Sequence, residues 1–221
     1  MRHFDIVLFD LDGTLSNSKE GITKSVQYAL AKFGIHETDL DKLEHFIGPP
    51  LVDEFVRAYN FSKEQAQIAT ATYRERYEPI GLYETSIYPD TEEMLQAVKH
   101  SGSLIGLATS KPQSMAEEVL RYLKIDQYFD YIMGAQKVGP RQSKTAVLTE
   151  LLTIIEEKEN TKLDLDNIVL VGDTTFDVVG ANNVGISSIG VEYGFGDKED
   201  MLAQGALCVV SSAKELADLL A

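Results

Sequence analysis

Carboxylates follow two apolar runs of this chain, at the point where each run ends. Asp10 and Asp12 come directly after Ile6–Phe9, and Asp173 ends the run "IVLVG", with Asp177 four residues further on. An unpaired buried charge is costly, and several carboxylates in one crevice do not all ionise without a cation. Hard oxygen ligands in this number suit Mg²⁺. The pattern therefore predicts a magnesium site among these side chains.

The pair Asp10 and Asp12 suits group transfer at phosphorus. Asp10 is nearest the strand end, and a carboxylate that attacks phosphorus forms an aspartyl-phosphate, which splits one difficult step into two. Asp12 lies two residues later and faces the same side, where it can protonate a leaving oxygen and then deprotonate water. Gly13 allows a tight turn close to a phosphate, and Ser110 is a second candidate phosphate-binding residue. The alternative is that these aspartates are turn or helix-cap residues without a chemical role, because "DGT" alone would fit a turn.

Polar residues at other predicted strand ends favour the chemical interpretation. The run "LIGLAT" ends at Thr109, and Lys144 begins the helix that follows "YIMGA". Thr109 can donate a hydroxyl hydrogen bond to a phosphoryl oxygen, and Lys144 can neutralise the transferring group and keep Asp10 ionised. We expect Lys111, close to Thr109, to be a lysine of the pocket rim or the surface.

The elements that position these residues alternate along the chain. Helical patterns separate the predicted strands, which cover residues 5–10, 104–109, 131–135, 167–173, 187–191 and 206–210. This alternation predicts an α/β fold, a doubly wound parallel sheet with helices on both faces. The strands are continuous apolar runs, as expected for strands that are buried on both sides. Parallel strands place their carboxyl ends at one edge, where ligands bind.

An early segment interrupts this alternation. Residues from 16 to about 80 contain helical patterns and no convincing strand. We therefore predict a catalytic core of residues 1–15 and 83–221, with a helical cap inserted as residues 16–82. Two capping boxes are predicted, Ser62 with Gln65 and Asp90 with Glu93.

The charge balance limits the partners of the chain. Twenty basic and thirty-five acidic residues give a formal net charge of −15, so the general surface suits neither nucleic-acid polymers nor anionic membranes. One cysteine, Cys208, excludes a disulfide within the chain. The first predicted strand leaves no room for a signal peptide, and no apolar run reaches the length of a membrane span. We therefore expect a cytoplasmic protein; its oligomeric state is not readable.

Together these motifs resemble those of the haloacid dehalogenase-like superfamily of phosphohydrolases. The resemblance covers essentially the whole chain and rests on "FDLDGTL", "ATSK", a later lysine and "VGDTTFD", in that order. The stretches "FIGPPL" and "VGDTTFDVVGANNVGISSIGVEYGFG" look like the branch of phosphoglycolate phosphatases and 5′-nucleotidases. The resemblance implies a Rossmann-like core, a small helical cap and Mg²⁺-dependent hydrolysis of a small phosphorylated metabolite through an aspartyl-phosphate.

The resemblance also implies a role for each matching residue. Asp10 corresponds to the nucleophile, which is also a Mg²⁺ ligand. Asp12 corresponds to the acid/base, with its backbone carbonyl on the metal. Asp173 corresponds to a metal ligand that Asp177 supports, and Thr109 to a phosphate-binding residue.

The active-site lysine is where the chain departs from the family pattern. Relatives often have lysine followed directly by proline, whereas this chain has "QKVGPRQSKTAVL". Lys144 begins a helix at the expected place, so we favour it over Lys137.

Several functions stay open at this point. The leading hypothesis is a phosphatase acting on phosphoglycolate or a nucleoside 5′-monophosphate. A sugar-phosphate mutase shares the first chemical step, and a pyrophosphatase also fits. A receiver-like signalling module would use similar carboxylates, but such modules are shorter and carry the phosphorylated aspartate on a later strand. Dehalogenation is disfavoured, because that branch needs neither the second aspartate nor Mg²⁺.

Overall fold

The computed structural model describes residues 3–221, which form two compact units. The core unit contains the residues up to Ser16 and Ile87–Ala221, and the helical unit contains Asn17–Ser86. The chain crosses between the units twice, at β2 (Ser16–Asn17) and β3 (Ser86–Ile87), and these two crossings pair as a short sheet. Each crossing strand has only two residues, which is too short to leave a pattern in the sequence.

The core unit is built on a six-stranded sheet, and the prediction of a doubly wound parallel α/β fold is confirmed. The strand order is β5-β4-β1-β6-β7-β8, and the recorded pairings are parallel. The strands are β1 (Ile6–Phe9), β4 (Leu104–Pro112), β5 (Tyr131–Ala135), β6 (Ile168–Gly172), β7 (Ser187–Val191) and β8 (Val209–Val210). Every residue of β1 and β6 is buried, which explains their uninterrupted apolar sequences.

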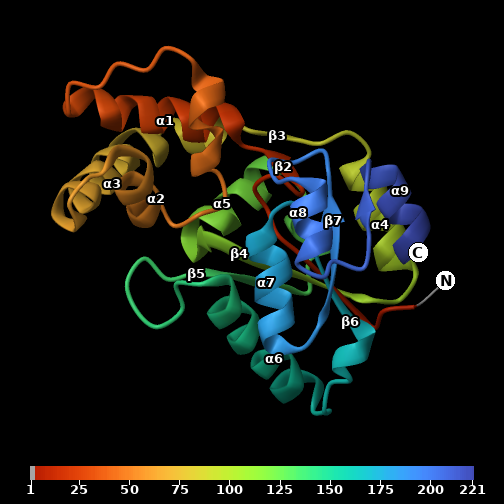
Figure 1. Cartoon of the computed structure of the whole chain (residues 1–221). Coiled ribbons are helices and arrows are strands. Elements are labelled where there is room, and N and C mark those ends of the chain that lie inside the picture. Colours follow the sequence, from red (N-terminus) through yellow and green to blue (C-terminus); the bar gives the residue numbers. More distant parts are fainter. Residues whose placement is uncertain (1–2) are drawn as a thin grey trace. The chain divides into compact units, whose positions relative to one another are not determined.

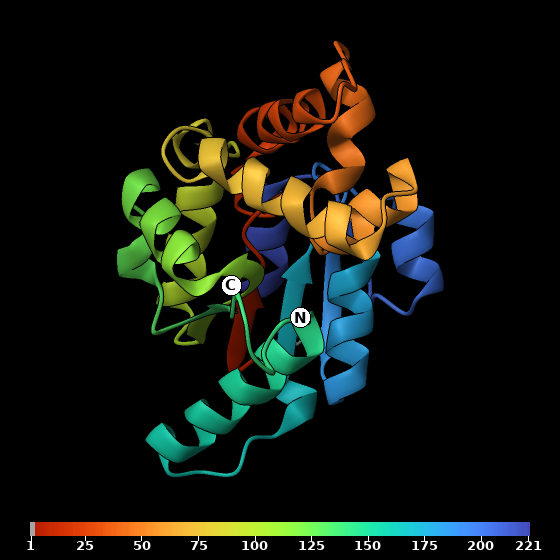
Figure 2. The ribbon, with the colours of Figure 1, turned by 90° about the vertical axis from the view of Figure 1, so that its left-hand side faces the viewer.

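Helices cover both faces of this sheet. Figure 1 shows α4 and α9 packed together on one side and α6 and α7 packed together on the other. The helices of the core unit are α4 (Thr91–His100), α5 (Gln113–Leu123), α6 (Lys144–Glu159), α7 (Thr175–Val184), α8 (Lys198–Ala203) and α9 (Ala213–Leu220). In Figure 2, β1 and β6 run side by side between these layers. The two buried faces make up the core that holds the strand ends in place.

An irregularity in β4 falls at the predicted site. Thr109 pairs with Gly134 of β5, and the next paired residue of β4 is Pro112, opposite Ala135. The predicted strand 104–109 is therefore too short, because pairing resumes three residues later. Ser110 and Lys111 lie within this irregular stretch, and such bulges re-aim side chains.

One of the two predicted capping boxes is present and the other is wrong. At α3, Ser62 Oγ accepts from the Gln65 N–H at 3.1 Å, and the Gln65 side chain accepts from the Ser62 N–H at 2.9 Å. Asp90 precedes α4 with a left-handed backbone (φ 61°), and its side chain caps none of the described helix N–H groups. A capping side chain normally extends from a β-region backbone, which Asp90 does not adopt.

The helical unit contains α1 (Lys19–Lys32), α2 (Leu51–Tyr59), α3 (Lys63–Tyr77) and a 3₁₀ segment at Leu40–Phe46. Its interior includes an aromatic cluster of Phe46, Phe55, Tyr59 and Phe61. Within residues 3–221, no helix combines the length and apolar character that crossing a bilayer requires.

Candidate active site

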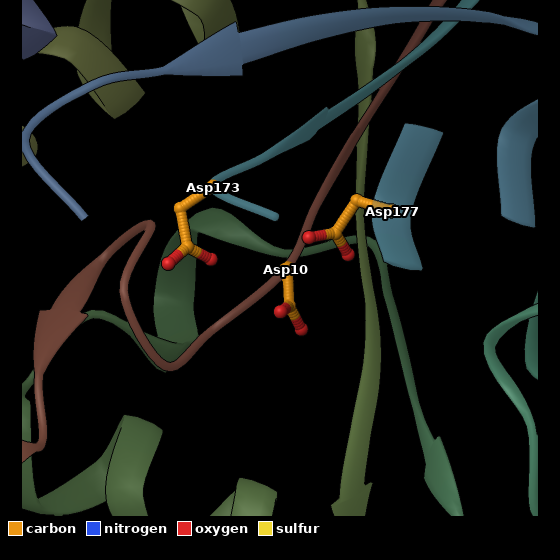
Figure 3. A group of neighbouring side chains, drawn as sticks. All are labelled: Asp10, Asp173 and Asp177. Atoms are coloured by element: carbon orange, nitrogen blue, oxygen red, sulfur yellow. The ribbon is translucent and has the colours of Figure 1, made fainter. Parts of the chain in front are cut away.

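Three carboxylates meet at the carboxyl-terminal edge of the core sheet. Asp10 follows β1, Asp173 follows β6, and Asp177 lies in the first turn of α7. One oxygen of each lies within 4.8 Å of the others, and all three side chains are buried. Figure 3 shows the three side chains next to one another. The structure thus brings together three of the four aspartates that end the predicted strands or follow them.

The register of β1 explains the position of Asp10. Phe9 pairs with Leu107 of β4 and with Val171 of β6, so Asp10 emerges between two neighbouring strands. The Asp10 N–H donates to the Val171 carbonyl at 2.9 Å. Because β1 is central in the sheet, its first residue past the strand stays buried while still reaching the edge.

Asp177 is fixed by the start of its own helix. Its Oδ2 accepts from the Thr174 N–H at 3.1 Å and from the Thr174 hydroxyl at 2.9 Å. This contact, half of a capping box, satisfies the backbone N–H of Thr174, the N-cap residue of α7. The other oxygen, Oδ1, lies 2.8 Å from the ammonium of Lys144.

Lys144 is the cation of the cluster. It is the first residue of α6, and its Nζ lies 2.8 Å from Asp10 Oδ1 and donates to the Ala108 carbonyl at 2.8 Å. Burial lowers the pKa of this ammonium, but Asp10 and Asp177 outweigh burial and raise it above its usual value. Lys137, the competing candidate, is exposed in the loop after β5. The structure therefore brings Lys144 to the carboxylates.

Asp173 accepts hydrogen bonds from two different parts of the chain. The Thr14 hydroxyl donates to its Oδ1 at 3.3 Å, and the Phe195 N–H donates to its Oδ2 at 2.9 Å. Burial raises the pKa of Asp173 well above its usual value, and Asp177 and Asp10 raise it further. A bound cation would favour the ionised form of this side chain.

Asp12 lies outside the three-carboxylate cluster and has its own lysine. Lys111 Nζ donates to Asp12 Oδ2 at 2.7 Å, and only 4% of the Lys111 side chain is exposed. Of the two expected positions for Lys111, the pocket rim or the surface, the surface is wrong, because the side chain is buried against Asp12 in the irregular stretch of β4. Asp12 Oδ1 is also buried and has no hydrogen-bond partner among residues 3–221.

The remaining predicted residues surround the same edge. Thr109 is buried, and its Oγ1 accepts from the Lys111 N–H at 3.2 Å. Ser110 is half-buried. Gly13 has a positive φ of 86°, and a Cβ atom there would lie 2.0 Å from Asp173 Oδ2. Only glycine therefore permits this approach of the turn to Asp173.

Sequence reasoning missed one segment of the site, the loop after β7. Phe195 supplies the N–H that binds Asp173, and the Tyr193 hydroxyl donates to the Thr14 carbonyl at 3.1 Å. A Cβ atom on Gly194 would lie 2.3 Å from Asp173 Cβ. This loop was included in the family resemblance through "GVEYGFG", but neither that stretch nor its aromatic–glycine alternation assigned a role or a neighbour to any of its residues.

The donor set fits a divalent metal ion. The cluster offers carboxylate oxygens from Asp10, Asp173 and Asp177, with no sulfur or imidazole ligand in the group. Hard oxygen donors of this kind suit Mg²⁺, Ca²⁺ or Mn²⁺. The crowding of buried carboxylates beside a single ammonium is also what a cation would relieve.

The fold and this edge of carboxylates define an α/β protein with a carboxylate-rich site at the strand ends, and the comparisons identify the family. A sequence model of the haloacid dehalogenase-like hydrolases matches residues 7–191. The chain belongs to this family and is a phosphohydrolase.

Individual proteins of known sequence or structure are similar to this chain over most of its length. A 5′-nucleotidase of Pseudomonas aeruginosa is 41% identical over 197 residues, which are 89% of this chain and 86% of that protein. A tyrosine-protein kinase, PtkA, of Mycobacterium tuberculosis is 33% identical over 97% of this chain and 70% of its own length. The crystal structure of a predicted phosphatase from Clostridium acetobutylicum superimposes with a TM-score of 0.90 at 40% identity, and 98% of each chain is covered.

Proposed function

We propose that this phosphohydrolase is a Mg²⁺-dependent phosphatase that hydrolyses a small phosphate monoester through an aspartyl-phosphate on Asp10. The observation that carries the proposal is the buried group of Asp10, Asp173 and Asp177 with Lys144 bound to two of them. A structural ion pair would need one carboxylate for each ammonium. The excess of buried carboxylate is explained by a bound metal ion, whose positive charge would favour the ionised carboxylates and the approach of an anionic phosphate.

In the first step, a carboxylate oxygen of Asp10 attacks phosphorus. Lys144 lies on Oδ1, so we assign the attack to Oδ2. A new P–O bond forms to Asp10 while the P–O bond to the leaving group breaks. The proton that the leaving oxygen needs comes from Asp12, through the buried Oδ1 that Lys111 does not occupy.

In the second step, water attacks the phosphorus of the aspartyl-phosphate. Asp12 accepts a proton from this water, the bond from phosphorus to Asp10 breaks, and inorganic phosphate is released. Asp12 thereby regains the proton that it donated, and Asp10 returns as a carboxylate.

The other residues hold the phosphoryl group and the metal. The carboxylates of Asp10 and Asp173 and the backbone carbonyl of Asp12 would hold Mg²⁺, which neutralises charge on the transferring group. Asp177 supports the cluster through its contact with Lys144. The phosphoryl oxygens bind the hydroxyls of Thr109 and Ser110 and the backbone at Gly13, a residue type that allows close approach.

For the substrate, we propose a nucleoside 5′-monophosphate. The 41% identity to a 5′-nucleotidase supports this choice over phosphoglycolate and pyrophosphate. We assign selection of the leaving group to the helical unit, Asn17–Ser86, as a cap domain, because the core supplies chemistry that is common to all phosphate esters.

A substrate panel tests the proposal. Purified protein is given nucleoside 5′-monophosphates, phosphoglycolate, pyrophosphate and a hexose 1-phosphate, with Mg²⁺ or with chelator, and phosphate release is measured. We expect release that depends on Mg²⁺ and is fastest with a nucleotide. The Asp10→Asn variant should show none, and a variant with wild-type turnover would contradict the nucleophile assignment.

Two readouts distinguish the competing functions. Conversion of the hexose 1-phosphate into its 6-phosphate, without phosphate release, would indicate a mutase. A phospho-enzyme that persists for minutes after substrate is consumed would indicate a signalling module. We expect instead an acid-trapped phosphate on Asp10 that disappears within turnover.

A further inference from the structure

Tyr193 connects two parts of the site that are far apart in sequence. Its hydroxyl donates to the Thr14 carbonyl at 3.1 Å, across 179 positions of the chain. Its ring packs on the ring of Tyr88, with centroids 4.8 Å apart and planes tilted by 58°. Burial raises the pKa of the Tyr193 hydroxyl, and neighbouring Tyr88 and Asp173 add to this effect. The group is therefore a neutral donor at physiological pH.

The loop that carries Tyr193 also holds Asp173. Two residues after Tyr193, the Phe195 N–H donates to Asp173 Oδ2 at 2.9 Å. Between them, Gly194 packs so closely that a Cβ atom would lie 2.3 Å from Asp173 Cβ and 2.4 Å from the Gly13 carbonyl oxygen. Any shift of Tyr193 would therefore move the groups that orient the Asp173 carboxylate.

The two contacts of Tyr193 flank the two chain crossings. Thr14 lies two residues before β2, and Tyr88 directly follows β3. The Tyr88 N–H donates to the Leu15 carbonyl at 3.2 Å, which joins the two crossings to each other. The Thr14 hydroxyl also donates a hydrogen bond to Asp173. Thr14 therefore contacts both Tyr193 and Asp173, and it lies just before the crossing at β2.

We propose that Tyr193 is a positioning residue that fixes Asp173 for the metal ion and transmits metal binding to residues 14–17 and 86–88, which contain the two crossings and the residues that flank them. This inference rests on the proposed function only in requiring a metal ion at Asp173. When the ion binds, Asp173 is held in one orientation, and the Phe195 and Thr14 contacts become more persistent. Tyr193 passes this restraint to Tyr88, so both crossings lose mobility together.

The first test measures metal affinity in the Tyr193→Phe variant. The substitution keeps the ring and removes only the hydrogen bond to Thr14. Loss of a group that bonds a metal ligand directly typically weakens metal binding by about tenfold or more. Tyr193 acts through Thr14, one contact further out, so we expect a smaller but measurable increase in the Mg²⁺ dissociation constant by calorimetry. The Mg²⁺ concentration for half-maximal activity should rise equally, while kcat at saturating Mg²⁺ stays within about twofold. If the role of Tyr193 were purely structural, the variant would have a lower kcat at saturating Mg²⁺ and a lower thermal stability, with no specific change in Mg²⁺ affinity.

A matched control is available in Tyr131→Phe. Tyr131 lies at the start of β5, and its hydroxyl donates to Glu159 at 2.6 Å, remote from the carboxylates. This variant loses one tyrosine hydrogen bond but should bind Mg²⁺ as the wild type does. Equal Mg²⁺ affinity in wild type and Tyr193→Phe would overturn the inference. Absence of Mg²⁺ binding in the wild type would instead overturn the proposed metal site itself.

The second test needs only the wild-type protein. Amide hydrogen exchange is compared with and without Mg²⁺. We expect slower exchange at Phe195 and, in addition, at the Tyr88 amide and within residues 14–17. Protection confined to Phe195, with unchanged exchange at both crossings, would show that binding is not transmitted and would overturn that part of the inference.

Discussion

Lys111 Nζ lies 2.7 Å from Asp12 Oδ2, and the contact joins residues 99 positions apart. The two side chains are 4% and 14% exposed, so the pair is largely shielded from solvent. It connects the irregular stretch of β4 with the turn after β1. The ammonium engages Oδ2 and leaves Oδ1 for the proton transfer that we propose for Asp12, which makes Lys111 a candidate for positioning Asp12.

The Lys111→Met variant should therefore lose turnover while it keeps its fold. Without the ammonium, the Asp12 carboxylate is free to rotate, and a displacement of about 1 Å costs on the order of a hundredfold in rate. We expect that loss in kcat with KM changed far less, measured by phosphate release. The control is Lys198→Met, which removes an exposed lysine paired with Glu192. Unchanged kcat in Lys111→Met would rule out the positioning role.

Lys144→Met should reduce both activity and stability. The variant leaves Asp10 and Asp177 buried without their ammonium, and breaking such a pair costs about 3–5 kcal/mol. We expect a lower denaturation midpoint in chelator and no measurable turnover. Lys137→Met, which changes the exposed lysine of the same region, should match the wild type in both measurements. The reverse pattern would make Lys137 the active-site lysine.

Asp173→Asn should stabilise the protein in chelator. Its pKa is raised in the folded state, so its contribution to stability is fully present below the unfolded pKa of about 3.9 and is lost as pH rises through the folded value. The variant does not ionise and can still accept from Phe195. We expect a gain of about 1 kcal/mol at pH 7, which shrinks toward pH 4.

In the presence of Mg²⁺, the wild type should instead be more stable than the Asp173→Asn variant. Ligand binding to the folded state stabilises the wild type in proportion to the logarithm of the Mg²⁺ concentration, whereas Asp173→Asn should not respond. Urea denaturation at pH 4 to 8, with Mg²⁺ or chelator, measures both effects. A variant that is less stable than the wild type in chelator at every pH would contradict the electrostatic account of Asp173.

Glu54→Gln should destabilise the helical unit. The Glu54 carboxylate is buried and bonds to both His45 and Arg57. Burial raises its pKa, but the bonds to Arg57 and His45 outweigh burial, and the pKa lies below its usual value. The stabilisation is thus present above the unfolded pKa of about 4.3 and is lost as pH falls through the folded value.

Denaturation of Glu54→Gln at pH 7 measures this contribution. We expect a loss of about 2 kcal/mol, less than for a fully buried pair because Arg57 is largely exposed. Asp53→Asn is the matched control, an exposed carboxylate on the same helix, and should change stability by less than about 0.5 kcal/mol. If the Glu54→Gln variant is as stable as the wild type, the contacts of Glu54 with His45 and Arg57 contribute nothing to the free energy of unfolding.

The strands, and the polar residues that follow them, could be predicted from the local sequence pattern. The runs before Asp10 and Asp173 are apolar because β1 and β6 are buried on both faces, and a parallel sheet has one carboxyl-terminal edge. Those two facts place distant carboxylates at one edge of the sheet, and the adjacency of β1 and β6 then makes them neighbours. The start of α6 at Lys144 was also predictable, because a helix start depends on neighbouring residues, here the N-cap Ser143.

Only the tertiary structure decided which side chains meet across that edge. Lys111 turns inward because pairing of β4 with β5 skips from Thr109 to Pro112, and Tyr193 reaches Thr14 because β7 ends beside the same edge. Both contacts depend on strand order and on a pairing irregularity, which arise from packing between segments far apart in sequence. Residue type and local spacing therefore do not predict either contact.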